Sequence, residues 1–550
     1  MAQEKKIKVM VLGFDGATFD ILDPLIKKGR LPNFARVRES GAWGRLRSTL
    51  PPLSGPAWTT FATGKYPGKH GIYDFFRNRP ENYDCTPVNA SFLESKTFWE
   101  VISEQGMKAG VANMLFTWPP QKVNGFVISG REAPSEEAPY THPEGLKEEI
   151  LKFEPGFKAE PFRQISRTKH FLRYAAEQLK RQERANKYLL ARYPCDLNVS
   201  FFAIPDILQH IFMWCMDPGH PNFRQKDADS FMPLIEECFA ALDGIIGGRL
   251  EVMDKDTALI IMSDHGAGPV RKVVQINKWL QEEGLLAIND SYGSRRVSSM
   301  IFMKDALRSM MNVASRFDVL GLRRVIGFKT REKRMAFARK NLVEWHRTKA
   351  YSGRVGEYGI HINLSGREGQ GNVSPREYEG VRDDIIRKLS ALKDPDTGQN
   401  VFERIWRREE AYQGPFVKYA PDLILDFGER PYLPGDSLLA RGVLEEVPRA
   451  GLGGMHRDHG IVMATGRGIK KGRFEGPNIC DLAPTILHLM AARIPDDMDG
   501  KVLSAMLAPE IARRPPDYYS TGGSEGGNNV IYSDKEAEEI SKRLGDLGYL

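Results

Sequence analysis

Three short apolar runs in this chain share one feature, which is that each ends in an aspartate. They are KVMVLGFD, which ends in Asp15, NVSFFAIPD, which ends in Asp206, and ALIIMSD, which ends in Asp264. Each run resembles a buried parallel strand in length and composition. Because helical patterns lie between the runs, the sequence predicts an α/β fold with a mainly parallel central sheet and helices on both of its faces.

The aspartates mark one edge of the predicted sheet. In open α/β sheets, ligands bind beyond the carboxyl ends of the strands, which is where all three aspartates would lie. His265 directly follows Asp264, and a backbone that turns at the end of a strand can aim both side chains at one metal ion. Taken alone, this dipeptide is more simply explained as a helix N-cap followed by a surface histidine.

Two further histidines extend the pattern. Asp206 and His210 are four residues apart after an apolar run, so a helix there would place both on one face, a spacing that suits one divalent ion. The alternative is an N-capping aspartate with a core histidine. His456 lies in the glycine-rich stretch GGMHRDHG, where a backbone can approach a site closely, and His459 competes with it as a ligand.

Together these residues offer three carboxylates and three imidazoles, which is enough to hold two metal ions. Mixed oxygen and nitrogen ligation favours zinc, with manganese as the second candidate, whereas an all-oxygen set would favour magnesium or calcium. The predicted ligands are Asp15, Asp206, His210, Asp264, His265 and His456.

Ser54 is the candidate for the group that acts on the substrate. It follows the proline-rich turn STLPPL and precedes a predicted helix, GPAWTTFATG, so we expect it at the helix N-cap. There the unpaired backbone N–H groups and the helix dipole favour a phosphate, and a neighbouring metal ion could deprotonate the hydroxyl. The simpler interpretation of such a serine in isolation is a plain N-cap.

Composition excludes several other classes of protein. The charge of +7, from 78 basic and 71 acidic residues, suits an anionic substrate but does not indicate nucleic-acid binding. The five cysteines are far apart and form no C-x-x-C pair, which is typical of free thiols in a reducing compartment. The N-terminal apolar run is too short for a signal peptide and no later run is long enough for a membrane span, so we expect a cytoplasmic location.

The chain of 550 residues is long enough for more than one folded unit. We expect a catalytic core at 1–289 and 344–515, a basic helical insertion or lid at 290–343, and a linker with an amphipathic C-terminal tail at 516–550. The insertion, which contains LRRVIGFKTREKRMAFARK, is most simply a solvated helical hairpin or lid. The alternative is a basic amphipathic surface that contacts phosphates or anionic lipid at a membrane.

In their order along the chain, these motifs resemble the alkaline phosphatase superfamily, and most of all its type I phosphodiesterase and nucleotide pyrophosphatase branch. The resemblance rests on GFDG, TGKYPGKHGI, PDILQH, SDHG and GMH, and it continues into DLAPTILHLM and DMDG. It implies an alkaline-phosphatase-like three-layer sandwich with a helical insertion. Only the insertion and the tail lie outside it.

The resemblance also assigns roles to the residues. It implies that Asp15, Asp264 and His265 hold one metal ion beside the nucleophile Ser54, and that the other ion is held by Asp206, His210 and His456. Ser54 stands ten residues before Gly64, the interval at which the branch carries its nucleophilic threonine or serine. His456 is preferred over His459 because the superfamily ligand follows a G-x-H pattern.

Three departures from the family pattern affect the expected chemistry. Gln209 stands where the branch often has glycine, and Ala57 replaces the asparagine that nucleotide pyrophosphatases place three residues after the nucleophile. A donor to the phosphate oxygens is therefore missing or supplied from elsewhere. Trp58 stands where the sulfatase signature has arginine, so we expect Ser54 to remain an ordinary hydroxyl. The residues considered as substitute donors, each more simply structural, are Thr59, Asn113 and Arg131.

The resemblance implies a metal-dependent hydrolase of a phosphodiester or pyrophosphate bond, acting through a phospho-serine intermediate on a small phosphorylated substrate such as a nucleotide. One alternative is a phosphomonoesterase or phosphate-transferring mutase, because the metal core is shared and the substrate pocket decides. An alternative of another class is a catalytically silent metal-binding or scaffold protein whose basic insertion acts at the surface of a membrane or a partner. The presence of the whole ligand set and the nucleophile weighs against it.

Overall fold

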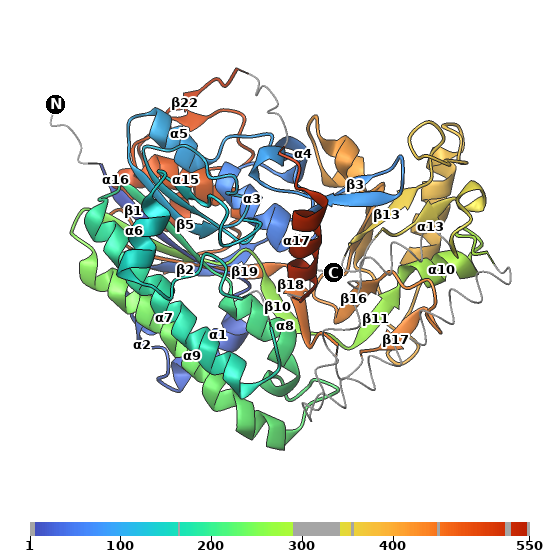
Figure 1. The fold of residues 1–550 in the computed structure, drawn as a ribbon, viewed down its shortest axis with the longest axis horizontal. Helices are drawn as coiled ribbons and strands as arrows, with labels where there is room; N and C mark the ends of the chain where they lie inside the picture. Colours follow the sequence, from blue (N-terminus) through green and yellow to red (C-terminus); the bar gives the residue numbers. More distant parts are fainter. Residues whose placement is uncertain are drawn as a thin grey trace.

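A nine-stranded sheet forms the centre of the protein (Figure 1). The computed structural model describes residues 6–162, 165–289, 342–353, 357–447, 451–522 and 530–546. The strand order in the sheet is β20-β2-β19-β9-β1-β8-β5-β6-β7. The strands are β1 (Lys8–Phe14), β2 (Ala42–Arg47), β5 (Ala109–Met114), β6 (Gly125–Ser129), β7 (Thr141–His142), β8 (Leu197–Phe202), β9 (Thr257–Met262), β19 (His459–Gly466) and β20 (Gly472–Arg473).

The middle of this sheet is parallel, as the apolar runs predict. Strands β9, β1, β8, β5 and β6 are consecutive neighbours, and each adjoining pair is parallel. The register places Phe14 beside Phe202, and Gly13 beside Met262. The ends of β1, β8 and β9 therefore coincide at one edge. Strand β19 is antiparallel to both of its neighbours, β9 and β2.

Helices cover both faces of the sheet, which confirms the predicted α/β fold (Figure 1). The longest pair, α7 and α9, packs together on one face, where α9 also contacts α2 and α8. On the other face α3 packs with α5 and α15. The helices are α1 (Phe19–Lys27), α2 (Pro32–Ser40), α7 (Lys169–Arg192), α8 (Ile204–Met216) and α9 (Gln225–Val252) on the first face, and α3 (Ser54–Thr63), α5 (Phe98–Glu104) and α15 (Leu482–Leu489) on the second.

A second hydrophobic core lies beside the sheet and is formed mainly by residues 270–455. Two small sheets, β16-β11-β17 and β12-β13-β15-β14, are packed with helices α10 and α13 around it. The ribbon of β10 (Gly266–Pro269) and β18 (Gly454–Arg457) connects this body to the central sheet. The other elements are α10 (Ile276–Glu282), β11 (Lys272–Gln275), β12 (Ala350–Tyr351), β13 (Gly359–Ile362), α13 (Tyr378–Ser390), β14 (Arg404–Arg407), β15 (Leu423–Asp426), β16 (Tyr432–Gly435) and β17 (Leu444–Glu446).

The predicted basic insertion falls almost wholly on residues 290–341, which lie outside the described residues. Its boundaries and its role as a lid or lipid-binding surface therefore stay predictions. The predicted amphipathic tail contains helix α17 (Asp534–Asp546). None of the described helices combines the length and the apolar character that crossing a bilayer requires.

Candidate active site

The turns after β1 and β9 bring the first predicted ligands together. Asp15 directly follows β1, while Asp264 and His265 follow β9, and all three side chains are fully buried. Gly16 makes this approach workable because its φ of +67° lets the chain turn at once. Its backbone N–H donates to Asp264 Oδ1 at 3.1 Å, and a side chain here would meet Asp206 Cβ at 3.1 Å.

Helix α8 supplies the next pair. Asp206 and His210 lie one turn apart on the same face, with 3.1 Å between Asp206 Oδ1 and His210 Nε2, so the prediction from their spacing is confirmed. Gln209, on the turn between them, donates from Nε2 to the carbonyl of Gly16 at 2.8 Å and to that of Pro205 at 2.8 Å. Gln209 therefore braces the turn that follows Asp15, and no local sequence pattern predicts this contact.

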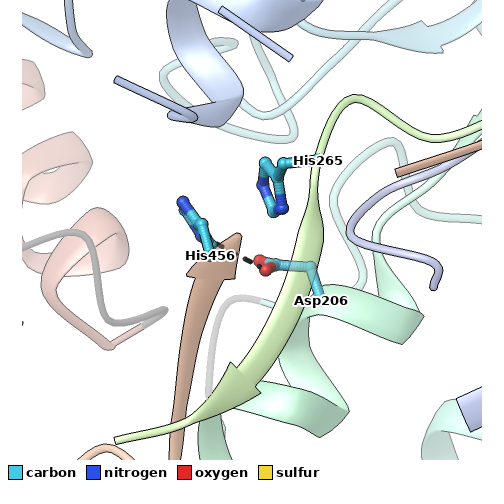
Figure 2. A group of neighbouring side chains, drawn as sticks. All are labelled: Asp206, His265 and His456. Atoms are coloured by element: carbon cyan, nitrogen blue, oxygen red, sulfur yellow. Dashed lines mark ion pairs between the residues drawn. The ribbon is translucent and has the colours of Figure 1, made fainter. Parts of the chain in front are cut away.

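His456 reaches the same point from strand β18 of the connecting ribbon. Its Nε2 lies 3.0 Å from His210 Nε2 and 3.4 Å from Asp206 Oδ1. Figure 2 shows Asp206, His265 and His456 pointing toward one another from three separate segments. The rings of His265 and His456 are stacked, with centroids 3.7 Å apart. Residues up to 250 positions apart in sequence, Asp206 and His456, thus meet at one cluster.

His459, the competing candidate, lies outside this cluster. Its side chain is 39% exposed, and its Nδ1 is 3.2 Å from Glu429 Oε1. It begins strand β19, beyond the end of the ribbon. The geometry therefore brings together the histidine that follows the G-x-H pattern and leaves the other at the surface.

Main-chain carbonyls orient each imidazole of the cluster. In all three rings Nδ1 lies within hydrogen-bond distance of a carbonyl oxygen, which can only accept, so Nδ1 carries the proton. Nε2 of each ring is then the nitrogen turned toward the carboxylates, as in the oriented histidines of metal sites. The bonds join His210 to Gly454 (2.9 Å), His265 to Gly266 (2.9 Å) and His456 to Pro52 (2.8 Å).

Ser54 adjoins the cluster from the start of helix α3. Its Oγ lies 3.0 Å from His265 Nε2 and 3.4 Å from Asp15 Oδ1, and the residue is fully buried. The N-cap prediction is wrong by one residue, since Leu53 is the N-cap and Ser54 is the first residue of α3. Because Leu53 takes the extended backbone of the cap position, the serine hydroxyl points toward Asp15 and His265 instead of capping its own helix.

Two overlapping groups of ligand atoms result. In each, the ligand atoms lie within 4.8 Å of one another, and the groups are Asp15 with Asp264 and His265, and Asp206 with His265 and His456. His210 adjoins the second group through its contacts with Asp206 and His456. All six predicted ligands and the predicted nucleophile therefore lie in one buried cluster at the carboxyl edge of the sheet.

Comparison with known proteins agrees with this geometry. The family model of type I phosphodiesterases and nucleotide pyrophosphatases matches residues 9–461. The chain belongs to this family. It is accordingly a hydrolase of the phosphodiesterase and pyrophosphatase type, and the family assignment made from the motifs is confirmed.

A solved structure supports the fold. Phosphonoacetate hydrolase from Sinorhizobium meliloti, in complex with phosphonoformate, matches with a TM-score of 0.50 and 17% identity over 88% of this chain and 96% of that one. Human ectonucleotide pyrophosphatase/phosphodiesterase 5 has a TM-score of 0.46 and 14% identity over 88% of this chain and 95% of its own. No curated protein matches the chain in sequence.

Burial makes two of the carboxylates, Asp15 and Asp264, hard to ionise without a cation. Burial first, and then the negative charges of Asp264 and Asp206, holds the pKa of Asp15 well above its ordinary value. Burial also raises the pKa of Asp264 to about 7. Among the described residues, Asp15 Oδ2 has no hydrogen-bond partner. A buried, partnerless carboxylate oxygen beside a second carboxylate is what a bound cation stabilises, so the site fits a metal ion.

Two of the three histidines in the cluster are suited to the same role. Burial lowers the pKa of His456 to about 3 and also lowers the pKa of His265, which keeps both rings neutral near pH 7. Neutral imidazole is the form that binds metal ions. At Asp206, burial opposes ionisation, but the contacts with His210 and His456 outweigh it and hold its pKa well below the ordinary value.

Two of the substitute donors proposed for Ala57 are engaged in the fold. Thr59 Oγ1 donates to the carbonyl of Gly55 in its own helix at 2.8 Å. Asn113 Nδ2 donates to the carbonyl of Ala159 at 2.8 Å. Both bonds hold parts of the fold together. The simpler structural interpretation therefore holds for the hydroxyl of Thr59 and for the amide nitrogen of Asn113.

Arg131 differs from these two residues. It lies two positions beyond the end of β6, at the sheet edge that carries the cluster, and its side chain is only 1% exposed. Its Nε lies 3.6 Å from Glu160 Oε2. Its positive charge is the last and smallest of the influences on the pKa of Asp15, which it lowers.

Proposed function

We propose that the protein is a metal-dependent hydrolase of a phosphodiester or pyrophosphate bond that acts through a phospho-serine intermediate. The observation that carries the proposal is the position of the Ser54 hydroxyl, which lies 3.0 Å from His265 Nε2 and 3.4 Å from Asp15 Oδ1 in a buried cluster. A buried serine hydroxyl beside two candidate ligands of one metal ion is arranged as a nucleophile.

The ligands divide into two sets. Asp15, Asp264 and His265 would hold the ion beside Ser54, and their ligand atoms lie within 4.8 Å of one another. The second ion would be held by Asp206, His210 and His456, whose nearest atoms are 3.0 to 3.4 Å apart. Mixed oxygen and nitrogen donors support zinc, with manganese as the second candidate.

The chain's own residues support a two-step displacement. Bound divalent ions supply Lewis acidity that lowers the pKa of a hydroxyl and offsets charge on phosphate oxygens. Ser54 Oγ attacks phosphorus, its proton leaves to solvent, and the bond to the leaving oxygen breaks. Water then attacks from the opposite side and frees Ser54 and the phosphate product. The carbonyl-anchored imidazoles keep their Nε2 atoms directed at the site in both steps.

A test of substrate class compares a diester with a monoester. We expect kcat/KM for bis-p-nitrophenyl phosphate to exceed that for p-nitrophenyl phosphate in the zinc-loaded protein, as the family assignment indicates. One observation favours the alternative of a phosphomonoesterase or phosphate-transferring mutase, because the buried cation of Arg131 suits the extra negative charge of a monoester. A preference for the monoester would therefore replace the diester proposal with this alternative.

We further propose that Arg131 takes the place of the missing phosphate-oxygen donor. Charge-assisted hydrogen bonds contribute about 1.5–3 kcal/mol, so Arg131→Met should lower kcat/KM roughly 10- to 100-fold. Arg249→Met is the matched control, since Arg249 is equally buried but pairs with Glu183 between α7 and α9. It should lower the melting temperature and leave kcat/KM unchanged. Equal kcat/KM in the wild type and Arg131→Met would contradict the role.

The buried site also supports a proposal for the substrate class. A small phosphorylated molecule, such as a nucleotide, fits a hydrolase with a buried nucleophile and two sets of ligands. The cytoplasmic location predicted from the cysteines and the N-terminus stays a prediction. All five cysteines are free thiols.

A further inference from the structure

The last described segment of the chain, residues 530–546, returns to the neighbourhood of the site. Figure 1 shows its helix α17 near the middle of the molecule, whereas β22 (Tyr518–Tyr519), which precedes it in sequence, lies at the upper edge. The family resemblance does not extend to this segment. The side chains of Tyr532 and Arg543 nevertheless donate hydrogen bonds to one loop of the catalytic body, residues 130–134, which follows β6.

Arg543 makes the main contact between α17 and this loop. Its Nη1 donates to the carbonyls of Arg131 and of Ala133, the latter at 2.9 Å, and its Nη2 donates to the carbonyl of Pro134 at 3.1 Å. The residue is 4% exposed. One guanidinium thus binds three carbonyls of a single loop, which a planar fork of donors can do and a point-like ammonium cannot do as fully.

Tyr532 holds the loop from the other end of the segment. Its hydroxyl donates to the carbonyl of Glu132 at 2.8 Å, and its ring stacks on Trp118 with centroids 5.1 Å apart. Ile540 and Leu544 are each 3% exposed and belong to the main hydrophobic core. The segment is therefore packed into the protein. Its side-chain hydrogen bonds from Tyr532 and Arg543 fall on the loop, and the backbone of Val530 is bonded to Asn89 and Ser91.

The loop is connected to the nucleophile through close packing. Gly130 lies so near the end of β5 that a Cβ atom there would be 2.4 Å from the carbonyl oxygen of Met114. Just beyond β5, the ring of Phe116 lies 3.5 Å from the position of a Cβ on Gly55, the neighbour of Ser54. A displacement of the loop would therefore be felt at the start of α3 as well as at Arg131.

We propose that residues 530–546 act as a clamp on the loop after β6, and that Arg543 is the positioning residue that holds the Arg131 guanidinium at the site for the substrate phosphate. The inference rests on the proposed function only for the identity of the ligand. Arg543 acts on the site indirectly, through its hydrogen bonds to the backbone carbonyls of the loop, and it contacts no reacting atom. The clamp thereby gives the C-terminal tail a part in substrate binding.

The test uses the full-length, zinc-loaded protein with inorganic phosphate as the probe. Calorimetry should show roughly tenfold weaker phosphate binding in Arg543→Met at unchanged zinc content, the loss of about one charge-assisted hydrogen bond. Arg543→Lys should recover part of the affinity. Lys542→Met, on the exposed side of the same helix, should bind phosphate as the wild type does. Hydrogen exchange of the amides at residues 130–134 should be faster in Arg543→Met, with or without zinc.

A stability control separates an effect on the position of Arg131 from a general loss of stability of the fold. Leu189→Ala creates a cavity in α7, far from the loop, and should lower the melting temperature without changing phosphate affinity. Unchanged phosphate affinity in Arg543→Met, or equal weakening by Leu189→Ala, would overturn the proposal, as would a wild type that binds no phosphate. None of these readouts needs turnover. Failure of the hydrolase proposal would instead appear as a phosphate-binding protein without activity.

Discussion

Turnover of bis-p-nitrophenyl phosphate is expected to fall roughly 10³-fold or more in Ser54→Ala, because the variant lacks the oxygen that forms the covalent intermediate. The buried position of Ser54 between Asp15 and His265 leaves no room for a second hydroxyl to replace it without rearrangement. The measurement is kcat for the zinc-loaded variant, with zinc content determined on the same sample.

Ser54→Thr is the matched control, since it retains the hydroxyl at the same position of α3. We expect it to keep measurable turnover and to form a phosphorylated protein, detectable by mass spectrometry after rapid acid quench. Ser54→Ala should bind zinc normally and show no such phosphorylation. Wild-type kcat in Ser54→Ala would remove Ser54 from the mechanism and point to direct attack by water.

Removal of metal should abolish turnover and destabilise the fold. The cluster contains three buried carboxylates, whose mutual repulsion bound cations would offset. An ion present at 1,000 times its Kd stabilises the native state by about 4 kcal/mol. We expect a chelator to lower the melting temperature by several degrees and to eliminate hydrolysis, and we expect zinc or manganese to restore both.

The zinc affinity should depend on pH in a direction set by Asp264. Burial raises the pKa of this carboxyl to about 7, so without metal it holds its proton below that pH. An ion must displace the proton, and the affinity should therefore fall as the pH decreases from 8 to 6. Competition titrations at several pH values would measure this. Melting of the metal-free protein at each pH shows whether it stays folded, and an affinity independent of pH would contradict the pKa shift as its cause.

Much of the site was predictable because it depends on local rules. Apolar runs ending in Asp15, Asp206 and Asp264 predict parallel strands whose carboxyl ends meet, and the structure aligns those ends. The spacing of Asp206 and His210 predicts one helix face, which the 3.1 Å contact confirms. The predicted N-cap position of Ser54 was wrong by one residue, because the conformation of Leu53 decides where α3 begins.

The remaining features depend on contacts between residues far apart in sequence. The carbonyls that orient the histidines come from loops whose approach no local pattern encodes, as with Pro52 and His456. The brace from Gln209 to Gly16 spans 193 residues, and the bond from Arg543 to Arg131 spans 412. Every residue has a backbone carbonyl, so the sequence gives little indication of which carbonyls will lie near a given side chain.

The placement of β19 also constrains how the chain can be made. This strand lies between β9 and β2 in the sheet. In sequence it follows β9 by nearly 200 residues, and β2 by more than that. Until residues 459–466 leave the ribosome, the edges of β9 and β2 that pair with β19 would lack their partner. His456 emerges just ahead of β19, so catalytic competence and closure of the sheet arrive together. A nascent chain halted before this point would expose the apolar edge of β9 and would lack the candidate ligand His456.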